Sequence, residues 1–321
     1  MRLFNQRLVG QRFETPVEAI RWLGAVQAQD YQGAKWALGQ RLTSTNSAGL
    51  DLAFDRGDFL RTHVMRPTWH FVAPEDIRWL LRLTGPRVRT TMATYNRRLG
   101  LDDALLARSR KILTAKLKDG THLARSEIAK ALVDDGFRLG DNRLAHILMD
   151  AELLGLICSG PLRGKQFTYA LLDERVPPAP ALARDEALAT LALRYFTSHG
   201  PATVQDFSWW SGLKMAEVRE AIDLAGSMLF HTVEEGKTWW LADGAHSRGV
   251  RKEALLAHVV TLNGFVVGGW KRPAPANRAE IETDLMRDMT SNEVKSLMRA
   301  VDDYGRFIGL PVTLPTRKAR R

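Results

Sequence analysis

One stretch of the chain, residues 122–172, constrains the fold more than any other. HLARSEIAKALVDDG and DNRLAHILMDAELLG each have helical periodicity and each end in a glycine, and Asp141 can cap the second. LICSGPLRGKQFTYALL follows as two apolar runs joined by a polar tip. A helix, a turn, a second helix and a β-hairpin predict a winged helix-turn-helix, in which the second helix and the hairpin tip face DNA.

The same order of elements returns at residues 183–243. ARDEALATLALRYFTSHG, PATVQDFSWWSG and LKMAEVREAIDLAG predict three helices, and MLFHTVEEGKTWWLA predicts a hairpin. A proline-rich stretch, RVPPAPALA, links this section to the one before it. We interpret the section as another winged helix and place Trp209 and Trp210 in its core. Because Glu234 and Glu235 make its hairpin tip acidic, we expect this tip to approach DNA less closely.

Residues 1–98 mix helices with one pair of strands. PVEAIRWLGAVQ predicts a helix capped by Thr15, and SAGLDLAFDRGD predicts another. FLRTHVMRPTWHFV alternates and predicts two strands that meet at Arg66-Pro67, and APEDIRWLLRLT begins a helix with Pro74 in its first turn. In HVVTLNGFVVGGWKR, further along, an Asn-Gly pair predicts a hairpin, and SNEVKSLMRAVDDYGRFIG predicts a helix before the basic tail TRKARR.

These patterns predict a helix-rich α+β fold of four units. They are a section of helices and two strands that contains a Gln-x-Gln motif (1–98), a winged helix (99–175), another winged helix (183–243), and a C-terminal β region with a basic tail (244–321).

The charge balance points to a polyanionic partner. Lys and Arg number 46 against 36 Asp and Glu, which gives a net charge of +10. This excess favours nucleic acid over an acidic membrane surface. The lone cysteine, Cys158, excludes an internal disulfide framework and fits a reducing cytosol. The eight histidines are scattered, without the spacing of a zinc site.

No 18-residue apolar run could span a membrane, and the N-terminal stretch has no apolar segment long enough for a signal peptide. We therefore expect a cytoplasmic, nucleoid-associated monomer that binds double-stranded DNA, with no metal, cofactor, membrane contact or obligate protein partner.

Four stretches together resemble the AlkZ-like winged-helix DNA glycosylases. They are WLGAVQAQD with AKWALGQR, RTHVMRPTWHFVAPEDIRWLL, HGPATVQDFSWWSGL and LNGFVVGGWKR. The resemblance implies tandem winged helices, a small C-terminal β-barrel and removal of alkylated bases, including bulky or interstrand-crosslinked ones. It makes residues 1–98 the first winged helix of the three and places the family's catalytic Gln-x-Gln pair there, on Gln27 and Gln29. WWLADGAHSRGVRKEALLAHVV is shorter than the corresponding stretch of the family, so we expect a shortened C-terminal region.

An amide pair suits the excision of a cationic purine. The alkylated base is already a good leaving group, so the enzyme must place a water against C1′ and stabilise the developing oxocarbenium sugar. A glutamine can accept from that water through its oxygen and donate through its NH₂ group. We assign Gln27 to the water and Gln29 as its partner, and Asp30 as an alternative base or as the residue that orients Gln29. The alternative is that two amides at a helix end cap backbone carbonyls.

Several other side chains are candidate DNA contacts. Arg66 at the strand turn is interpreted as a phosphate ligand, and His70 either lines the lesion cleft or is structural. Trp36 and Trp69 either pack against a damaged base or belong to the core. The complete DNA-binding set that we predict is Lys35, Trp36, Arg61, Arg66, His70, Arg163 and Lys165.

Two functions other than excision also fit the pattern. A non-catalytic winged-helix regulator would have the same charge and the same helix-turn-helix units. A damage sensor that has lost part of its barrel would keep the glutamines without the activity.

Overall fold

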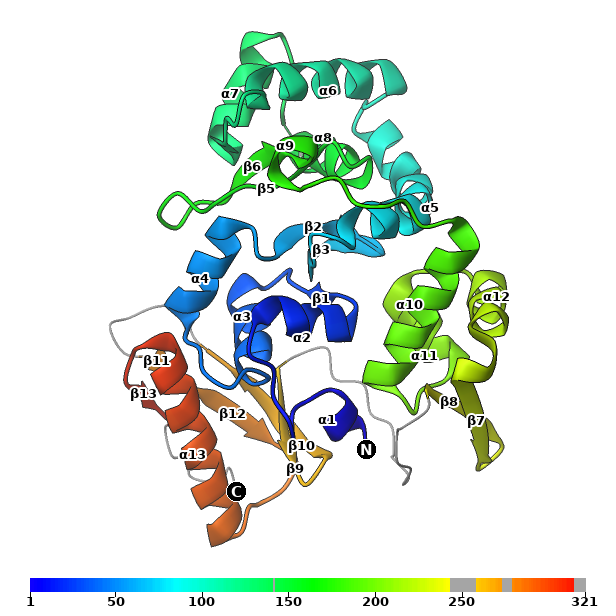
Figure 1. The fold of residues 1–321 in the computed structure, drawn as a ribbon. Coiled ribbons are helices and arrows are strands. Elements are labelled where there is room, and N and C mark those ends of the chain that lie inside the picture. The colour runs from blue at the N-terminus through cyan, green and yellow to red at the C-terminus, as the bar shows by residue number, and fades with distance from the viewer. Residues whose placement is uncertain (141, 243–257, 273–278, 315–321) are drawn as a thin grey trace.

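The computed structural model describes residues 1–140, 142–242, 258–272 and 279–314. These residues form a mixed fold of helices and small sheets around adjoining hydrophobic cores (Figure 1). Asp141, the expected cap of the helix in DNRLAHILMDAELLG, lies outside the described residues.

The first section surrounds a three-stranded antiparallel sheet with strand order β1-β3-β2. Its elements are α1 (Arg2–Asn5), α2 (Pro16–Leu23), β1 (Val26–Gln27), α3 (Tyr31–Gly39), α4 (Ser47–Arg56), β2 (Leu60–Val64), β3 (Arg66–Val72) and α5 (Ile77–Arg98).

The start of α2 confirms the predicted cap, but its end differs from the prediction. Thr15 and Glu18 form a reciprocal capping box at the first turn. Gly24 then stops the helix with a φ of 79°, a conformation that favours glycine. The glutamine motif therefore begins on strand β1. The expectation that it closes a helix is wrong, because β1 pairs with β3, a strand that comes much later in the chain.

The second section has the expected order, two helices and then a hairpin, with further short elements around them. Its elements are α6 (Asp103–Leu117), β4 (Leu123–Ala124), α7 (Arg125–Asp134), α8 (Arg143–Leu153), β5 (Ile157–Ser159), β6 (Thr168–Leu171) and α9 (Leu172–Arg175). The third section also has the expected order. Its elements are α10 (Arg184–His199), α11 (Val204–Ser211), α12 (Met215–Ala225), the 3₁₀ turn η1 (Gly226–Met228), β7 (Leu229–Glu234) and β8 (Lys237–Ala242).

The described part of the C-terminal section contains two small open sheets and one helix. Strands β9 (Val259–Leu262), β10 (Phe265–Lys271) and β12 (Glu282–Leu285) form one sheet, and β11 (Ala279–Glu280) pairs with β13 (Val312–Thr313) in the other. Helix α13 runs over Ser291–Ile308. The predicted Asn263-Gly264 hairpin turn is confirmed, since it joins β9 to β10. These strands do not close into a barrel among the described residues, so the barrel stays a prediction.

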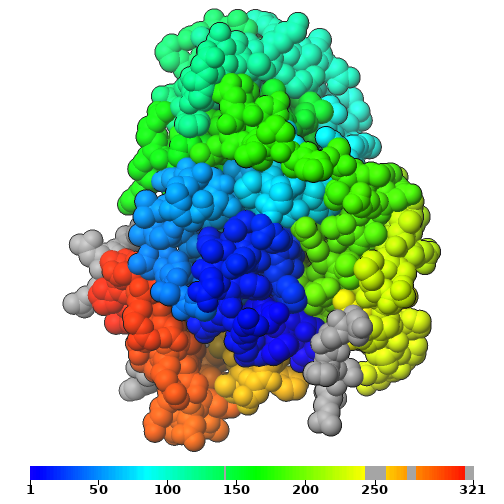
Figure 2. All heavy atoms as spheres, in the orientation of Figure 1, coloured from blue at the N-terminus to red at the C-terminus, as the bar shows by residue number. Residues whose placement is uncertain are grey.

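The β2–β3 hairpin lies where the sections meet. β3 contributes Phe71 to the core of α2, α3 and α4, while β2 contributes Leu60 and Val64 to the core shared by α5 and α10–α12. Close packing locks the hairpin turn to α11: a Cβ at Gly212 would lie 2.1 Å from the carbonyl oxygen of Met65. The space-filling view shows the sections packed against one another without separation (Figure 2).

None of the described helices combines the length and the hydropathy needed to cross a bilayer.

Candidate active site

Gln27 is the last residue of the edge strand β1, and Gln29 lies two residues beyond it. Gln27 is paired with His70 of β3, and the Ala28 N–H donates to the Trp69 carbonyl at 2.7 Å, which extends the ladder. Gln27 and Gln29 are exposed, whereas Ala28 between them is fully buried. Both predicted catalytic residues are therefore open to solvent, on either side of a buried residue.

The two amides differ in their partners. The backbone N–H of Trp69 donates to Gln29 Oε1 at 3.4 Å. Within the described part of the chain, the Gln27 amide has no hydrogen-bonding partner. The Gln27 oxygen is therefore available to a water molecule, while the Gln29 oxygen already accepts a hydrogen bond.

Asp30 stabilises the start of the next helix. Its Oδ1 accepts from the Gly33 N–H at 3.1 Å and so caps α3. Its Oδ2 lies 3.2 Å from Nε2 of His258, whose ring lies against Trp270 with the centroids 4.8 Å apart. Both carboxylate oxygens are thus engaged away from Gln29, which favours a structural role for Asp30 over a role as base.

Two of the predicted DNA contacts are packed inside the protein. Lys35 is 1% exposed, and its Nζ donates to Ser47 Oγ at 2.7 Å and to both Asp51 carboxylate oxygens at 2.8 Å. Trp36 packs edge-on against Tyr304 of α13, with ring centroids 5.2 Å apart. We correct both expectations, because a buried, paired ammonium has no free donor for a phosphate and Trp36 anchors the C-terminal helix.

Arg61 supports the glutamine strand from behind. It is 8% exposed, and its Nε donates to the carbonyl oxygen of Ala28 at 3.0 Å. Its guanidinium lies 4.2 Å from the ring centroid of Trp69 and 4.6 Å from that of Phe167. Burial lowers the pKa of Arg61 below its ordinary value. The predicted DNA contact is corrected here too, because the side chain holds the backbone between the two glutamines.

His70 is a structural histidine in this arrangement. It is 1% exposed, with Nδ1 2.9 Å from the Thr68 carbonyl and Nε2 buried without a partner among the residues that the structure describes. Burial, helped by the charge of Arg66, lowers the pKa of His70 to about 3. A neutral, buried imidazole does not line a cleft, so of the two alternatives for His70 the structure favours the structural one.

Arg66, which is half-buried, and the exposed Trp209 form a pair at the β2–β3 turn. The Arg66 guanidinium lies 4.7 Å from the ring centroid of Trp209, and Trp209 is 65% exposed. The expectation that Trp209 belongs to the core is wrong, whereas its neighbour Trp210 packs on Tyr195 and Phe207. Adjacent residues of a helix point about 100° apart, so one tryptophan faces the core and the other faces outward.

The β5–β6 tip presents one paired and one unpaired cation. Arg163 Nη1 is 2.8 Å from both Glu127 carboxylate oxygens, and its Nη2 donates to the His122 carbonyl at 2.8 Å. Lys165 is exposed and has no such partner among the described residues. Both remain accessible at the end of a long hairpin, as predicted.

A buried carboxylate behind Trp69 was missed from the sequence. Glu152 of α8 is 1% exposed. Its Oε1 accepts from the Trp69 indole N–H at 3.3 Å, and its Oε2 is bonded to Nδ1 of His63. The one signal in the sequence was a glutamate among the apolar residues of DAELLG. Charged residues are rarely fully buried unless they are paired, so such a position could have indicated a buried, paired carboxylate.

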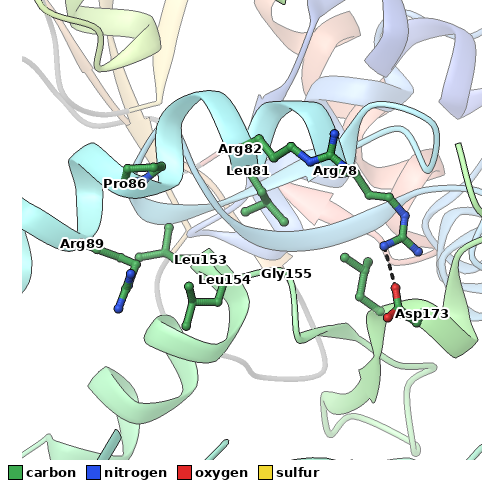
Figure 3. Close-up of a pocket in the computed structure, with 10 residues that line it drawn as sticks. Arg78, Leu81, Arg82, Pro86, Arg89, Leu153, Leu154, Gly155 and Asp173 are labelled. Atoms are coloured by element: carbon green, nitrogen blue, oxygen red, sulfur yellow. Dashed lines mark hydrogen bonds and ion pairs between the residues drawn. The ribbon is translucent and has the colours of Figure 1, made fainter. Parts of the chain in front are cut away.

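A hollow of about 460 Å³ elsewhere on the molecule contains none of the predicted residues (Figure 3). It lies between α5 and the α8–α9 region and is lined in part by Arg78, Arg82 and Arg89. Arg78 is paired with Asp173 and Arg89 with Asp150. The glutamine face therefore lies outside this hollow.

Residues 20–259 match the sequence profile described as DNA glycosylase AlkZ-like. The chain belongs to the AlkZ-like DNA glycosylase family. Enzymes of this class hydrolyse N-glycosyl bonds in DNA, and the AlkZ-like match covers β1 and the helices of the second and third sections.

Two known proteins extend this AlkZ-like assignment. A curated relative from Streptomyces sahachiroi, the interstrand DNA cross-link repair glycosylase, is 25% identical over 262 residues, which cover 77% of this chain and 69% of the relative. The solved structure of Streptomyces sahachiroi DNA glycosylase AlkZ matches with a TM-score of 0.78 at 21% identity, over 98% of this chain and 97% of that one. The fold is therefore AlkZ-like over nearly its whole length.

Proposed function

We propose that this glycosylase hydrolyses the N-glycosidic bond of cationic alkylated purines in double-stranded DNA, with Gln27 and Gln29 as its catalytic residues. The observation that carries the proposal is the exposure of both amides at the end of β1, where the Gln27 oxygen has no partner among the described residues and the Gln29 oxygen accepts a hydrogen bond. Gln27 then accepts a hydrogen bond from the attacking water. Gln29 presents its NH₂ group to an oxygen of the sugar or phosphate.

The open position of the glutamines supports bulky substrates. A base that is crosslinked to both strands cannot rotate into a deep pocket as an ordinary flipped base does. An exposed edge strand can approach such a lesion from outside the helix. The curated relative is named an interstrand DNA cross-link repair glycosylase, so we place bulky and crosslinked purine adducts in the substrate class.

The DNA path that we propose uses cations of the two hairpins. Arg66 with Trp209 at the β2–β3 turn, and Lys165 with Arg163 at the β5–β6 tip, take the phosphate contacts. In this arrangement the units 1–98, 99–175 and 183–243 act as winged helices, and 244–321 is the shortened β region. We propose that the enzyme acts as a monomer in the cytoplasm, at the nucleoid.

The test is the double change Gln27→Ala with Gln29→Ala. Loss of a positioned water should lower the excision rate by roughly 10²–10⁴-fold, while affinity for DNA stays within a few-fold. The matched control is Gln32→Ala, another exposed glutamine on the neighbouring helix α3. Single-turnover release of 7-methylguanine from a duplex measures the effect. A double variant that keeps wild-type excision overturns the catalytic assignment.

The charge of the lesion supplies a second test. An amide can neither protonate nor deprotonate the base strongly, so excision should be seen for 7-methylguanine and be absent for uracil or 8-oxoguanine. Because glutamine does not titrate, the rate should vary little between about pH 6 and 9. Efficient removal of uracil would contradict the mechanism. Tight binding to undamaged DNA without any base release would indicate a regulator instead.

A further inference from the structure

Glu152 is a buried carboxylate that the proposed reaction does not yet use. It lies on α8 of the second section, yet both of its oxygens point to the hairpin of the first. Removing a carboxylate from water costs several kcal/mol unless hydrogen bonds compensate. Here the compensation comes from the Trp69 indole and from His63, the only residues to which the described structure bonds this carboxylate.

Trp69 is fixed by more than this one hydrogen bond. The His63 ring lies 4.4 Å from the Trp69 ring, and the Arg61 guanidinium lies 4.2 Å from the Trp69 ring centroid. The backbone of Trp69 is held as well, because its carbonyl accepts from Ala28 at 2.7 Å. The same residue therefore connects Glu152 to the strand that carries the glutamines.

The last connection determines how the Gln29 amide is oriented. The Trp69 backbone N–H is a donor, so the Gln29 atom that faces it at 3.4 Å must be the oxygen. The NH₂ group of Gln29 is then turned away from β3. If Trp69 shifts, this hydrogen bond is lost and the amide can rotate to present its oxygen, which would repel the sugar and phosphate oxygens.

We propose that Glu152 is a positioning residue that acts on Gln29 through Trp69. It keeps the Gln29 amide oriented as a hydrogen-bond donor, while Gln27 accepts the hydrogen bond of the attacking water. The inference rests on the proposed function, since it assigns separate tasks to the two glutamines. It also makes the second section part of the active site without any contact of its own with the lesion.

The experiment compares Glu152→Ala in two backgrounds under single-turnover conditions with saturating 7-methylguanine duplex. In the otherwise wild-type enzyme, the excision rate should fall about tenfold while the Kd for DNA changes less than twofold. In the Gln29→Ala background, where Gln27 still supports a measurable rate, the same change should have no further effect. Glu152→Gln should recover most of the rate, because its amide oxygen can still accept from the indole.

Asp150 supplies the matched control. It is another buried carboxylate of α8, but it pairs with Arg89 at 3.0 Å and Arg110 at 2.5 Å, away from Trp69. Asp150→Asn should lower thermal stability and leave excision by the folded protein unchanged. Trp69→Phe, which removes only the indole donor, should slow excision several-fold even where Glu152→Ala fails to fold.

The outcomes separate this inference from the proposed function. Equal rate losses from Glu152→Ala in both backgrounds, or a Trp69→Phe enzyme with wild-type rate, overturn the positioning role while Gln29 stays catalytic. If Gln29→Ala and the double glutamine variant both keep full excision, the proposed function itself fails.

Discussion

The β2–β3 and β5–β6 hairpins both carry arginines, yet they use them differently. In β2–β3 the turn residue Met65 is buried beneath α11, and Arg61 is enclosed between two aromatic rings. In β5–β6 the strands are buried but the connection extends outward (Figure 1), and its residues Arg163 and Lys165 are exposed. An arginine enclosed within the hairpin supports the site, whereas we propose that the cations of an exposed connection contact DNA.

The largest expected effect tests the supporting hairpin. Arg61→Met removes the donor to the Ala28 carbonyl and the cation beside Trp69, with little loss of volume. An unsatisfied buried acceptor costs about 1–3 kcal/mol, so we expect the free energy of unfolding to fall by roughly 3 kcal/mol and excision by at least tenfold. Denaturant unfolding and single-turnover excision measure this. If Arg61→Met instead has normal stability and weaker DNA binding, as expected for Lys165→Ala, then Arg61 contacts DNA and does not support the site.

The next effect concerns pH. Because the folded-state pKa of His70 is lowered to about 3 from its ordinary 6.5, the unfolded chain binds a proton that the folded one excludes. Its contribution to stability is complete above pH 6.5 and is lost as the pH falls towards 3, by about 1.4 kcal/mol per pH unit. His199, whose pKa is also lowered to about 3, should add a similar slope. In denaturant unfolding measured between pH 6.5 and 5, His70→Asn should reduce the slope of the unfolding free energy against pH by the equivalent of about one proton. An unaltered slope would mean that the pKa of His70 is not lowered in the folded protein.

The sequence predicted most of the helices because their signals are local. Thr15 and Glu18 are three residues apart, and Asn263-Gly264 forms its turn on its own. The predicted location of the glutamines at the end of a helix was wrong, because a strand of two residues is too short to show a periodic pattern. Strand β1 forms by pairing with His70 and Phe71, which come later in the chain.

The candidate site was predicted in part for the same reason. Gln27 and Gln29 were identified through their motif, whose spacing of two also suits one face of a strand. The prediction that Lys35 contacts DNA was wrong because its partner, Asp51, lies on the next helix and no local sequence pattern indicates their pairing. Glu152 was missed because its two partners belong to another section of the chain.

A smaller effect is expected at the Arg66–Trp209 pair, where the β2–β3 hairpin also offers a cation for DNA. Trp209→Ala should weaken duplex binding by about tenfold, which corresponds to the lower half of the roughly 1–3 kcal/mol that base stacking is worth, because the guanidinium also loses its support. Trp210→Phe, on the core side of the same helix, is the control for packing. Titration of a fluorescent duplex measures both, and unchanged affinity for Trp209→Ala would remove this surface from the DNA path.

The smallest effect separates the two cations of the β5–β6 tip. Lys165→Ala should weaken binding to all duplexes a few-fold and reduce the slope of log K against log salt by about one unit. Arg163→Ala should reduce it less, because Arg163 must give up Glu127 before it can hold a phosphate. Binding measured at several salt concentrations tests this order. If Arg163→Ala reduces the salt slope as much as Lys165→Ala or more, the ion pair with Glu127 does not weaken the contact of Arg163 with phosphate.

The contact between Asp30 and His258 has a consequence for synthesis on the ribosome. The residue that caps α3 directly after the glutamines meets its partner only when a segment roughly 230 positions later has emerged. At ordinary elongation rates that is a delay of between about ten and fifty seconds. During this interval the nascent chain already carries both catalytic amides, but this link between the glutamine strand and the C-terminal sheet does not yet exist. The surroundings of the glutamines are therefore completed late in translation, after the other sections have been synthesised.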